Sequence, residues 1–175
     1  MRQHRAPPNH HNLAAAAPAT TRNAPLEPLE RLLDRFHTVA QQLRRRHGSR
    51  STLAISDEYD VQDLLHALLL IEFADVRPEE TAPSYAGGNS RMDFLLRREE
   101  IVVEVKHTRA NLTDREIGEE LLVDIGRYRT HQNCRTLVCF VYDPQHLLRN
   151  PVGLEDDLSR THDGLHVRVI VRPRT

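Results

Sequence analysis

The chain has 175 residues, of which 39% are hydrophobic and 28% are charged, and its formal net charge is −1. This length suits one domain with a real hydrophobic core, and the composition is that of a soluble globular protein. A net charge near zero excludes a broadly basic surface, so a nucleic-acid partner would be contacted through local arginine clusters and a metal ion. No apolar run approaches the length that spans a membrane.

Residues 1–25 are predicted to form a disordered tail. They include Pro7-Pro8, His10-His11 and a run of four alanines from Ala14, and they show no apolar periodicity. Such a segment lacks the apolar surface needed to fold alone.

Residues 26–50 are predicted to carry an N-terminal amphipathic helix. Apolar residues recur at helical spacing from Leu26 to Arg46, and Gly48 marks the end. The last turn contains Arg44, Arg45 and Arg46. These arginines either complement the helix dipole or contact phosphate.

Residues 51–175 are predicted to form the main domain, which begins with a helix from about Asp57 to Phe73. Glu58 falls at the border of its apolar stripe. Its carboxylate either reaches the active face of a sheet or only stabilises the first helical turn. Gln62, one turn later, is a weaker candidate for the same position.

A β-hairpin is predicted after this helix. Its strands, Met92–Arg97 and Ile101–His107, are rich in apolar and β-branched residues and are separated by a charged turn. An edge strand near Glu80–Tyr85 is expected to precede the hairpin.

The turn length determines which residues of the hairpin face each other. Pairing Leu96 with Ile101 places Asp93 directly opposite Glu104. Lys106 lies on the same face as Glu104, because side chains alternate along a strand. Three ionisable side chains are therefore expected on one patch of the sheet.

Two carboxylates that face each other across a strand pair repel, and a bound divalent cation would reverse the sign of that interaction. Lys106 is also the only lysine in the total of 24 lysines and arginines. A compact ammonium at this position favours a chemical role. The alternative is an ordinary surface ion pair, which contributes little and does not require lysine.

A third helix is predicted from Thr113 to about Arg129, because Thr113 and Glu116 form a capping box. Asp124 projects from its apolar side, which is unusual for an acid. It either pairs with an arginine in the core or points into the site.

The remaining elements are a buried strand at Thr136–Tyr142, a short helix near Leu154–Arg160 and a half-exposed strand at Leu165–Val171. The two cysteines, Cys134 and Cys139, suffice for neither a disulfide framework nor a zinc site. This pattern fits a reducing, cytoplasmic setting. The predicted fold is α/β, with a mixed central sheet flanked by helices.

Asp93 followed by Glu104-Val105-Lys106 across a hairpin resembles the core of the PD-(D/E)XK nuclease superfamily. The longer run from Tyr85 to Phe94, together with Glu104–Arg109, is similar to the restriction-endonuclease-like domain of the DpnII/MboI type. Met92 stands where the superfamily name has proline. The resemblance implies a restriction-endonuclease-like core.

The resemblance also implies metal-dependent hydrolysis of a phosphodiester bond, most readily in DNA, and a role in defence against foreign DNA. Asp93 and Glu104 would hold Mg²⁺, or Mn²⁺ as a substitute, with the Val105 carbonyl as a further ligand. Lys106 would position or deprotonate the attacking water. Glu58 is the expected acid from the preceding helix.

Further residues are expected around this centre. Those that would support it are Asp124, Tyr128 and Gln62, and those that would contact phosphate are Arg91, Arg109 and Arg127. Cleavage of both DNA strands would favour a homodimer. A second hypothesis is a catalytically silent module that binds nucleic acid or protein, and the same chemistry would also serve a phosphatase or an RNase.

Overall fold

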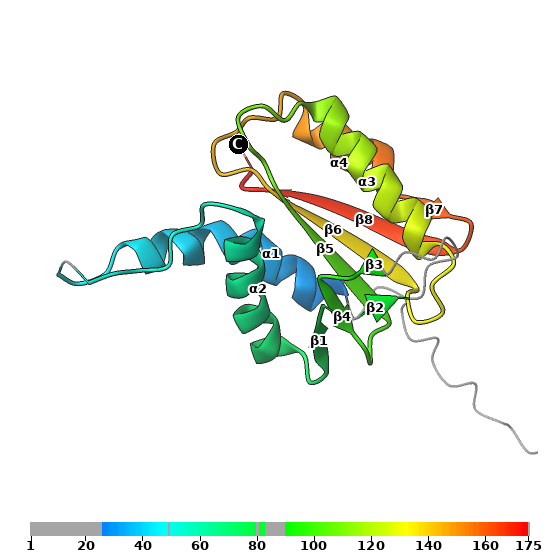
Figure 1. Ribbon diagram of the computed structural model, residues 1–175, viewed down its shortest axis with the longest axis horizontal. Helices are drawn as coiled ribbons and strands as arrows, with labels where there is room; N and C mark the ends of the chain where they lie inside the picture. Colours follow the sequence, from blue (N-terminus) through cyan, green and yellow to red (C-terminus); the bar gives the residue numbers. More distant parts are fainter. Residues whose placement is uncertain (1–25, 49, 80, 83–89, 175) are drawn as a thin grey trace, which may run out of the picture.

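The computed structural model contains a six-stranded mixed sheet with helices on both faces (Figure 1). It describes residues 26–48, 50–79, 81–82 and 90–174. The tail predicted at residues 1–25 lies outside the described residues. None of the described helices is long and apolar enough to cross a membrane.

The main sheet has the strand order β1-β4-β5-β6-β8-β7. Its strands are β1 (Val76–Pro78), β4 (Phe94–Leu96), β5 (Ile101–His107), β6 (Thr136–Tyr142), β7 (Thr161–His162) and β8 (Leu165–Arg172). The central strands β5, β6 and β8 are parallel, and the outer pairings are antiparallel. A separate two-stranded sheet pairs β2 (Thr81–Ala82) with β3 (Ser90–Arg91).

The helices divide between the two faces of the sheet. They are α1 (Leu26–Arg44), α2 (Glu58–Glu72), α3 (Asp114–Tyr128) and α4 (Pro151–Leu158). The first two pack with one apolar cluster of sheet residues, and the last two pack with the other (Figure 1). The predicted fold class is thereby confirmed.

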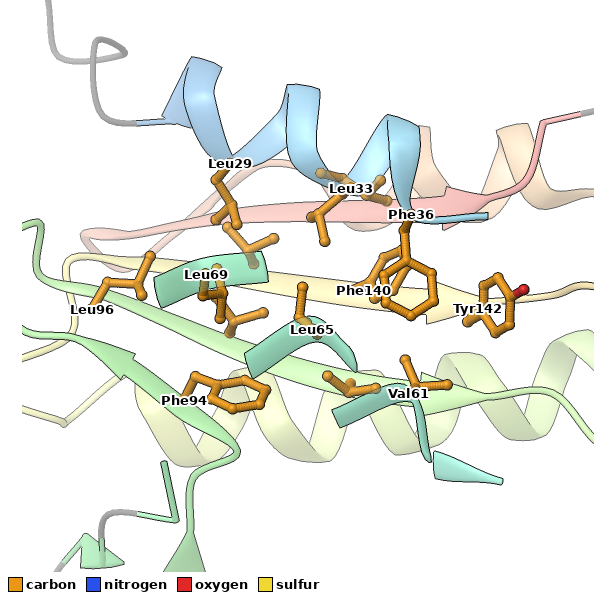
Figure 2. Packing of buried hydrophobic residues seen from close by; sticks show 14 of the residues in the cluster. Leu29, Leu33, Phe36, Val61, Leu65, Leu69, Phe94, Leu96, Phe140 and Tyr142 are labelled. Carbon is orange, nitrogen blue, oxygen red and sulfur yellow. The ribbon is translucent and has the colours of Figure 1, made fainter. Parts of the chain in front are cut away.

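The apolar side of α1 is part of the hydrophobic core on one face of this sheet. Figure 2 shows side chains from α1, α2 and β6 meeting over it, among them Leu33, Leu65 and Phe140. The Phe36 ring packs edge-on, with centroid distances of 5.2 Å to Phe140 and 5.0 Å to Tyr142. Such pairs add to the free energy gained from burying apolar area.

Ion pairs connect the polar side of α1 to β8. Arg172 is 5% exposed, and its Nε lies 2.6 Å from Asp34 Oδ1. The Arg168 Nε is 2.6 Å from Glu30 Oε1. α1 is thus attached to the sheet through both apolar packing and charge pairing.

Several predicted details differ from the structure. The strand predicted at Met92–Arg97 is shorter and spans Phe94–Leu96. The edge strand of the main sheet is Val76–Pro78, and the described part of the strand predicted near Glu80–Tyr85, Thr81–Ala82, lies in the separate two-stranded sheet. Helix α4 begins at Pro151 and not near Leu154, because Asn150 caps it and proline suits the first helical position. Strand β8 is more buried than expected toward its end.

We predict that Phe36→Ala lowers the free energy of unfolding by about 3–5 kcal/mol, because it removes a fully buried aromatic ring from between α1 and β6. Urea unfolding measures the change, and the exposed Thr38→Ala on the same helix is the control. A loss below about 1 kcal/mol, or a separate transition for residues 26–50, would contradict the packing of α1.

Candidate active site

The predicted register of the hairpin is the one that the structure contains. Leu96 pairs with Ile101 and Phe94 pairs with Val103, so the next pair along brings Asp93 beside Glu104. Asp93 lies immediately before β4, and its Oδ2 accepts a hydrogen bond from the Val105 backbone N–H at 2.7 Å. The strand pairing therefore places the two carboxylates together.

Both oxygens of Asp93 have a fixed donor. Besides the Val105 amide at Oδ2, the Gln62 side-chain amide donates to Oδ1 at 2.9 Å. Gln62 comes from α2, so that helix and the neighbouring strand together orient the carboxylate. Each oxygen retains a lone pair for a further ligand.

Glu104 is buried on the face of the sheet that α3 covers. It is 3% exposed, and its Oε1 accepts a hydrogen bond from the Tyr128 hydroxyl. Its Oε2 lies 3.8 Å from Lys106 Nζ. Oε1 is thus hydrogen-bonded to a residue of α3, and Oε2 is directed toward Lys106.

Lys106 makes its shortest ion pair with Asp124. Its Nζ is 3.0 Å from Asp124 Oδ2, and Asp124 is 4% exposed. The other oxygen, Oδ1, lies 3.1 Å from Arg127 Nη1. Asp124 therefore contacts Lys106 with one oxygen, while the arginine on its other oxygen, Arg127, is partly exposed and does not lie in the core.

Glu58 is the first residue of α2 and lies near the end of β5 that carries Lys106 and His107. Burial raises the pKa of Glu58, while the Lys106 charge and the His107 backbone N–H act in the opposite direction. The helix start consequently delivers a third carboxylate to the lysine.

The carboxylates of Asp93 and Glu104 hold protons more tightly than usual. Burial raises the pKa of Asp93 to about 6. Burial, followed by repulsion from Asp93 and Asp124, raises the pKa of Glu104 to about 8. Crowded negative charge of this kind is typical of functional sites.

The negative charge of Glu104 and Asp124 also shifts the pKa values of Lys106 and Tyr128. Burial alone would lower the pKa of Lys106, but Asp124 and Glu104 raise it above its usual value. Burial and the Glu104 charge raise the pKa of Tyr128. The lysine is therefore a fixed cation, and the tyrosine is a neutral hydrogen-bond donor.

Two of the three arginines predicted to contact phosphate pair with acids other than Asp93, Glu104 and Asp124. Arg91 Nη2 is 2.6 Å from Glu79 Oε2 in an exposed pair, and Arg109 Nη2 is 3.8 Å from Glu120 Oε1. Arg127 is the one of the three arginines that pairs directly with a buried residue of the cluster. The roles proposed for all three stay predictions.

One backbone amide belongs to the cluster and was not predicted. The Val105 N–H donates a hydrogen bond to Asp93 Oδ2. A main-chain donor leaves no signal in residue identity, so only the strand pairing could have revealed this contact.

The donor set fits a hard divalent cation. Within the described residues, no three His, Cys, Asp or Glu side chains are arranged as a metal-binding group. Mg²⁺ requires fewer protein side chains, because it usually binds one or two carboxylates and completes its coordination shell with water and phosphate oxygens. Asp93 and Glu104, with raised pKa values and neighbouring oxygens, meet that requirement.

An Asp, a Glu and a Lys on paired strands of a mixed α/β sheet define a restriction-endonuclease-like protein. The chain matches the model of the DpnII-MboI restriction endonuclease family (REase_DpnII-MboI) over residues 27–174, and it belongs to that family. The resemblance drawn from the sequence is thus confirmed. No curated protein and no solved structure matches the chain.

We predict that metal-free protein loses stability as the pH rises from about 5 to 8. The folded state holds the Glu104 proton more tightly than the unfolded state, so deprotonation favours unfolding in this range. Glu104→Gln keeps a neutral acceptor for Tyr128 and should reduce the pH dependence by about 2–4 kcal/mol. Urea unfolding in chelator at several pH values measures this.

The exposed Glu119→Gln on α3 is the matched control, because it removes the same charge outside the cluster. Equal pH dependence of wild type and Glu104→Gln would contradict the raised pKa of Glu104.

Proposed function

We propose that this protein is a metal-dependent endonuclease that hydrolyses phosphodiester bonds in DNA, with Mg²⁺ as its ion and Mn²⁺ as a substitute. Membership of a restriction endonuclease family indicates DNA cleavage. The observation that carries the metal dependence is the pair of facing carboxylates, half-buried Asp93 and buried Glu104, beside the only lysine of the chain.

Asp93 and Glu104 would hold the ion, with the Val105 carbonyl as a further ligand. A bound divalent ion polarises a phosphoryl oxygen and lowers the pKa of its water. Gln62, the Val105 amide and Tyr128 orient the two carboxylates through the hydrogen bonds described above. These three donors would keep the ligands in place during turnover.

Lys106 would act as a cation and not as a base. Asp124 and Glu104 raise its pKa, so it remains an ammonium at neutral pH. A fixed positive charge near the phosphate stabilises the negative charge that develops during hydrolysis. Asp124 sets the position of this ammonium, and Arg127 compensates the second oxygen of Asp124.

Glu58 is the group we assign to the attacking water. Its carboxylate lies near Lys106 and the backbone of His107. Burial raises its pKa, which makes it a better proton acceptor than an exposed glutamate.

The biological setting is also part of the proposal. We propose that the protein acts in the cytoplasm, in defence against foreign DNA. Two free, buried cysteines are compatible with a reducing compartment. Cutting both strands of a duplex would be served by a homodimer with one site for each strand.

We predict that Lys106→Ala reduces cleavage of duplex DNA in Mg²⁺ by about 10²–10⁴-fold, because the charge-stabilising ammonium is lost. Cleavage of a plasmid, followed on gels under single-turnover conditions, measures the rate. The control is Arg115→Ala, whose side chain is exposed and paired with Glu119. Equal cleavage by wild type and Lys106→Ala would refute the role of the lysine.

We predict that Mg²⁺ raises the melting temperature of the wild type by several degrees and that Asp93→Asn removes this effect. Binding to the folded state alone stabilises it by mass action, and the asparagine loses the ligand charge. Calorimetric titration with the metal measures binding without DNA. Absence of Mg²⁺ and Mn²⁺ binding to the wild type would favour the silent binding module.

A further inference from the structure

A second polar site lies on the face of the sheet opposite to Glu104. A surface cavity of about 360 Å³ is formed between the C-terminal part of α1 and the loop that follows β6. Its polar lining consists of His37, Gln41, Arg44, Tyr142, Gln145 and His146. No acidic residue lines it, although the chain has 25 acidic residues.

A chain of hydrogen bonds gives this cavity a defined donor. The Gln41 amide nitrogen lies 2.8 Å from His37 Nε2, and His37 Nδ1 lies 2.8 Å from the Tyr142 hydroxyl oxygen. When Gln41 donates to Nε2, the neutral ring carries its proton on Nδ1 and donates it to Tyr142. The Tyr142 hydroxyl proton is then left to donate to a ligand.

Arg44 supplies a positive charge, and His146 supplies an imidazole. Both side chains are exposed, and neither forms an ion pair with any residue that the structure describes. An arginine and an imidazole that border one cavity without a carboxylate are suited to an oxyanion, to which guanidinium offers several donors.

The loop that carries His146 is held in an uncommon conformation. His146 has φ 52°, in the left-handed region that non-glycine residues rarely occupy. The buried Asp143 carboxylate fixes this loop by accepting hydrogen bonds from the backbone N–H groups of Leu147 and Leu148 and from the Thr108 hydroxyl. A strained residue kept in place by buried contacts suggests a functional reason for its position.

We propose that this cavity binds a phosphate group, with Arg44, His146 and the Tyr142 hydroxyl as its donors. The group comes from a DNA backbone or from a small phosphorylated molecule. The DNA source rests on the proposed function and would be a phosphate near the scissile one. Tyr142 pairs with His107, the residue after Lys106, so the cavity lies at the same end of the sheet as the catalytic cluster.

Whether the bound phosphate belongs to DNA is tested by measuring DNA binding under conditions that prevent cleavage. Anisotropy of a labelled duplex is titrated in chelator at several salt concentrations for wild type, Arg44→Ala and Tyr142→Phe. Arg44→Ala should weaken binding about 5–10-fold and reduce the salt slope by about 0.9, the value expected for one lost phosphate contact. The control is Arg35→Ala, which removes an exposed charge from α1 outside the cavity.

The site itself is tested with inorganic phosphate. NMR signals of the His37 and His146 rings should shift during the titration in wild type and should respond about tenfold more weakly in Arg44→Ala. Ring shifts without any change in the DNA salt slope would assign the cavity to a small phosphorylated molecule and reject the DNA source. No shift with phosphate and equal DNA binding by Arg44→Ala and Arg35→Ala would overturn the proposal.

These outcomes are separate from those of the nuclease proposal. Lys106→Ala should lose cleavage and retain the phosphate-induced shifts of the histidine rings. If wild type never cleaves DNA while Arg44→Ala still lowers the salt slope, the nuclease proposal fails and the phosphate site stands.

Discussion

The close approach of two facing carboxylates is the constraint on which the site depends. Asp93, which is half-buried, and Glu104, which is buried, meet on an antiparallel pair beside the central strands, where water screens their repulsion less than at the surface. Burial of unpaired charge costs several kcal/mol, so each oxygen requires a donor or a cation. Gln62, Tyr128 and a backbone amide supply the donors, and Lys106 supplies the charge.

The position of Lys106 explains why this residue is not an arginine. Its ammonium fits between Glu104 and Asp124, which approach it from the same strand and from α3. A planar guanidinium in this space would meet two carboxylates with a rigid fork instead of a single compact charge. Arg127 occupies the outer side of Asp124, where side chains are less buried and the larger group can be accommodated. Negative and positive side chains therefore alternate from β5 to the outside of α3, in the order Glu104, Lys106, Asp124 and Arg127.

The sequence predicted the hairpin register, because a period of two and a short turn leave few pairings. It also predicted α3 and its acid, because a capping box and an aspartate on an apolar stripe are both visible in residue order. It did not predict the three-residue edge strand Val76–Pro78, which is too short to show alternation. It left Glu58 between two interpretations, because the distance from a helix start to β5 depends on tertiary packing that residue order does not show.

Consecutive residues of one strand connect the two sites. Lys106 faces α3, and His107 faces the side covered by α1, since side chains alternate along β5. The centroid of the His107 ring lies 5.8 Å from that of the Tyr142 ring, which borders the cavity. A shift of β5 by one residue would exchange these faces and dismantle both sites together. The packing of α2 on this face of β5 therefore supports the cluster of Glu104 and Lys106 as well, since it lies against the far side of the strand that carries them.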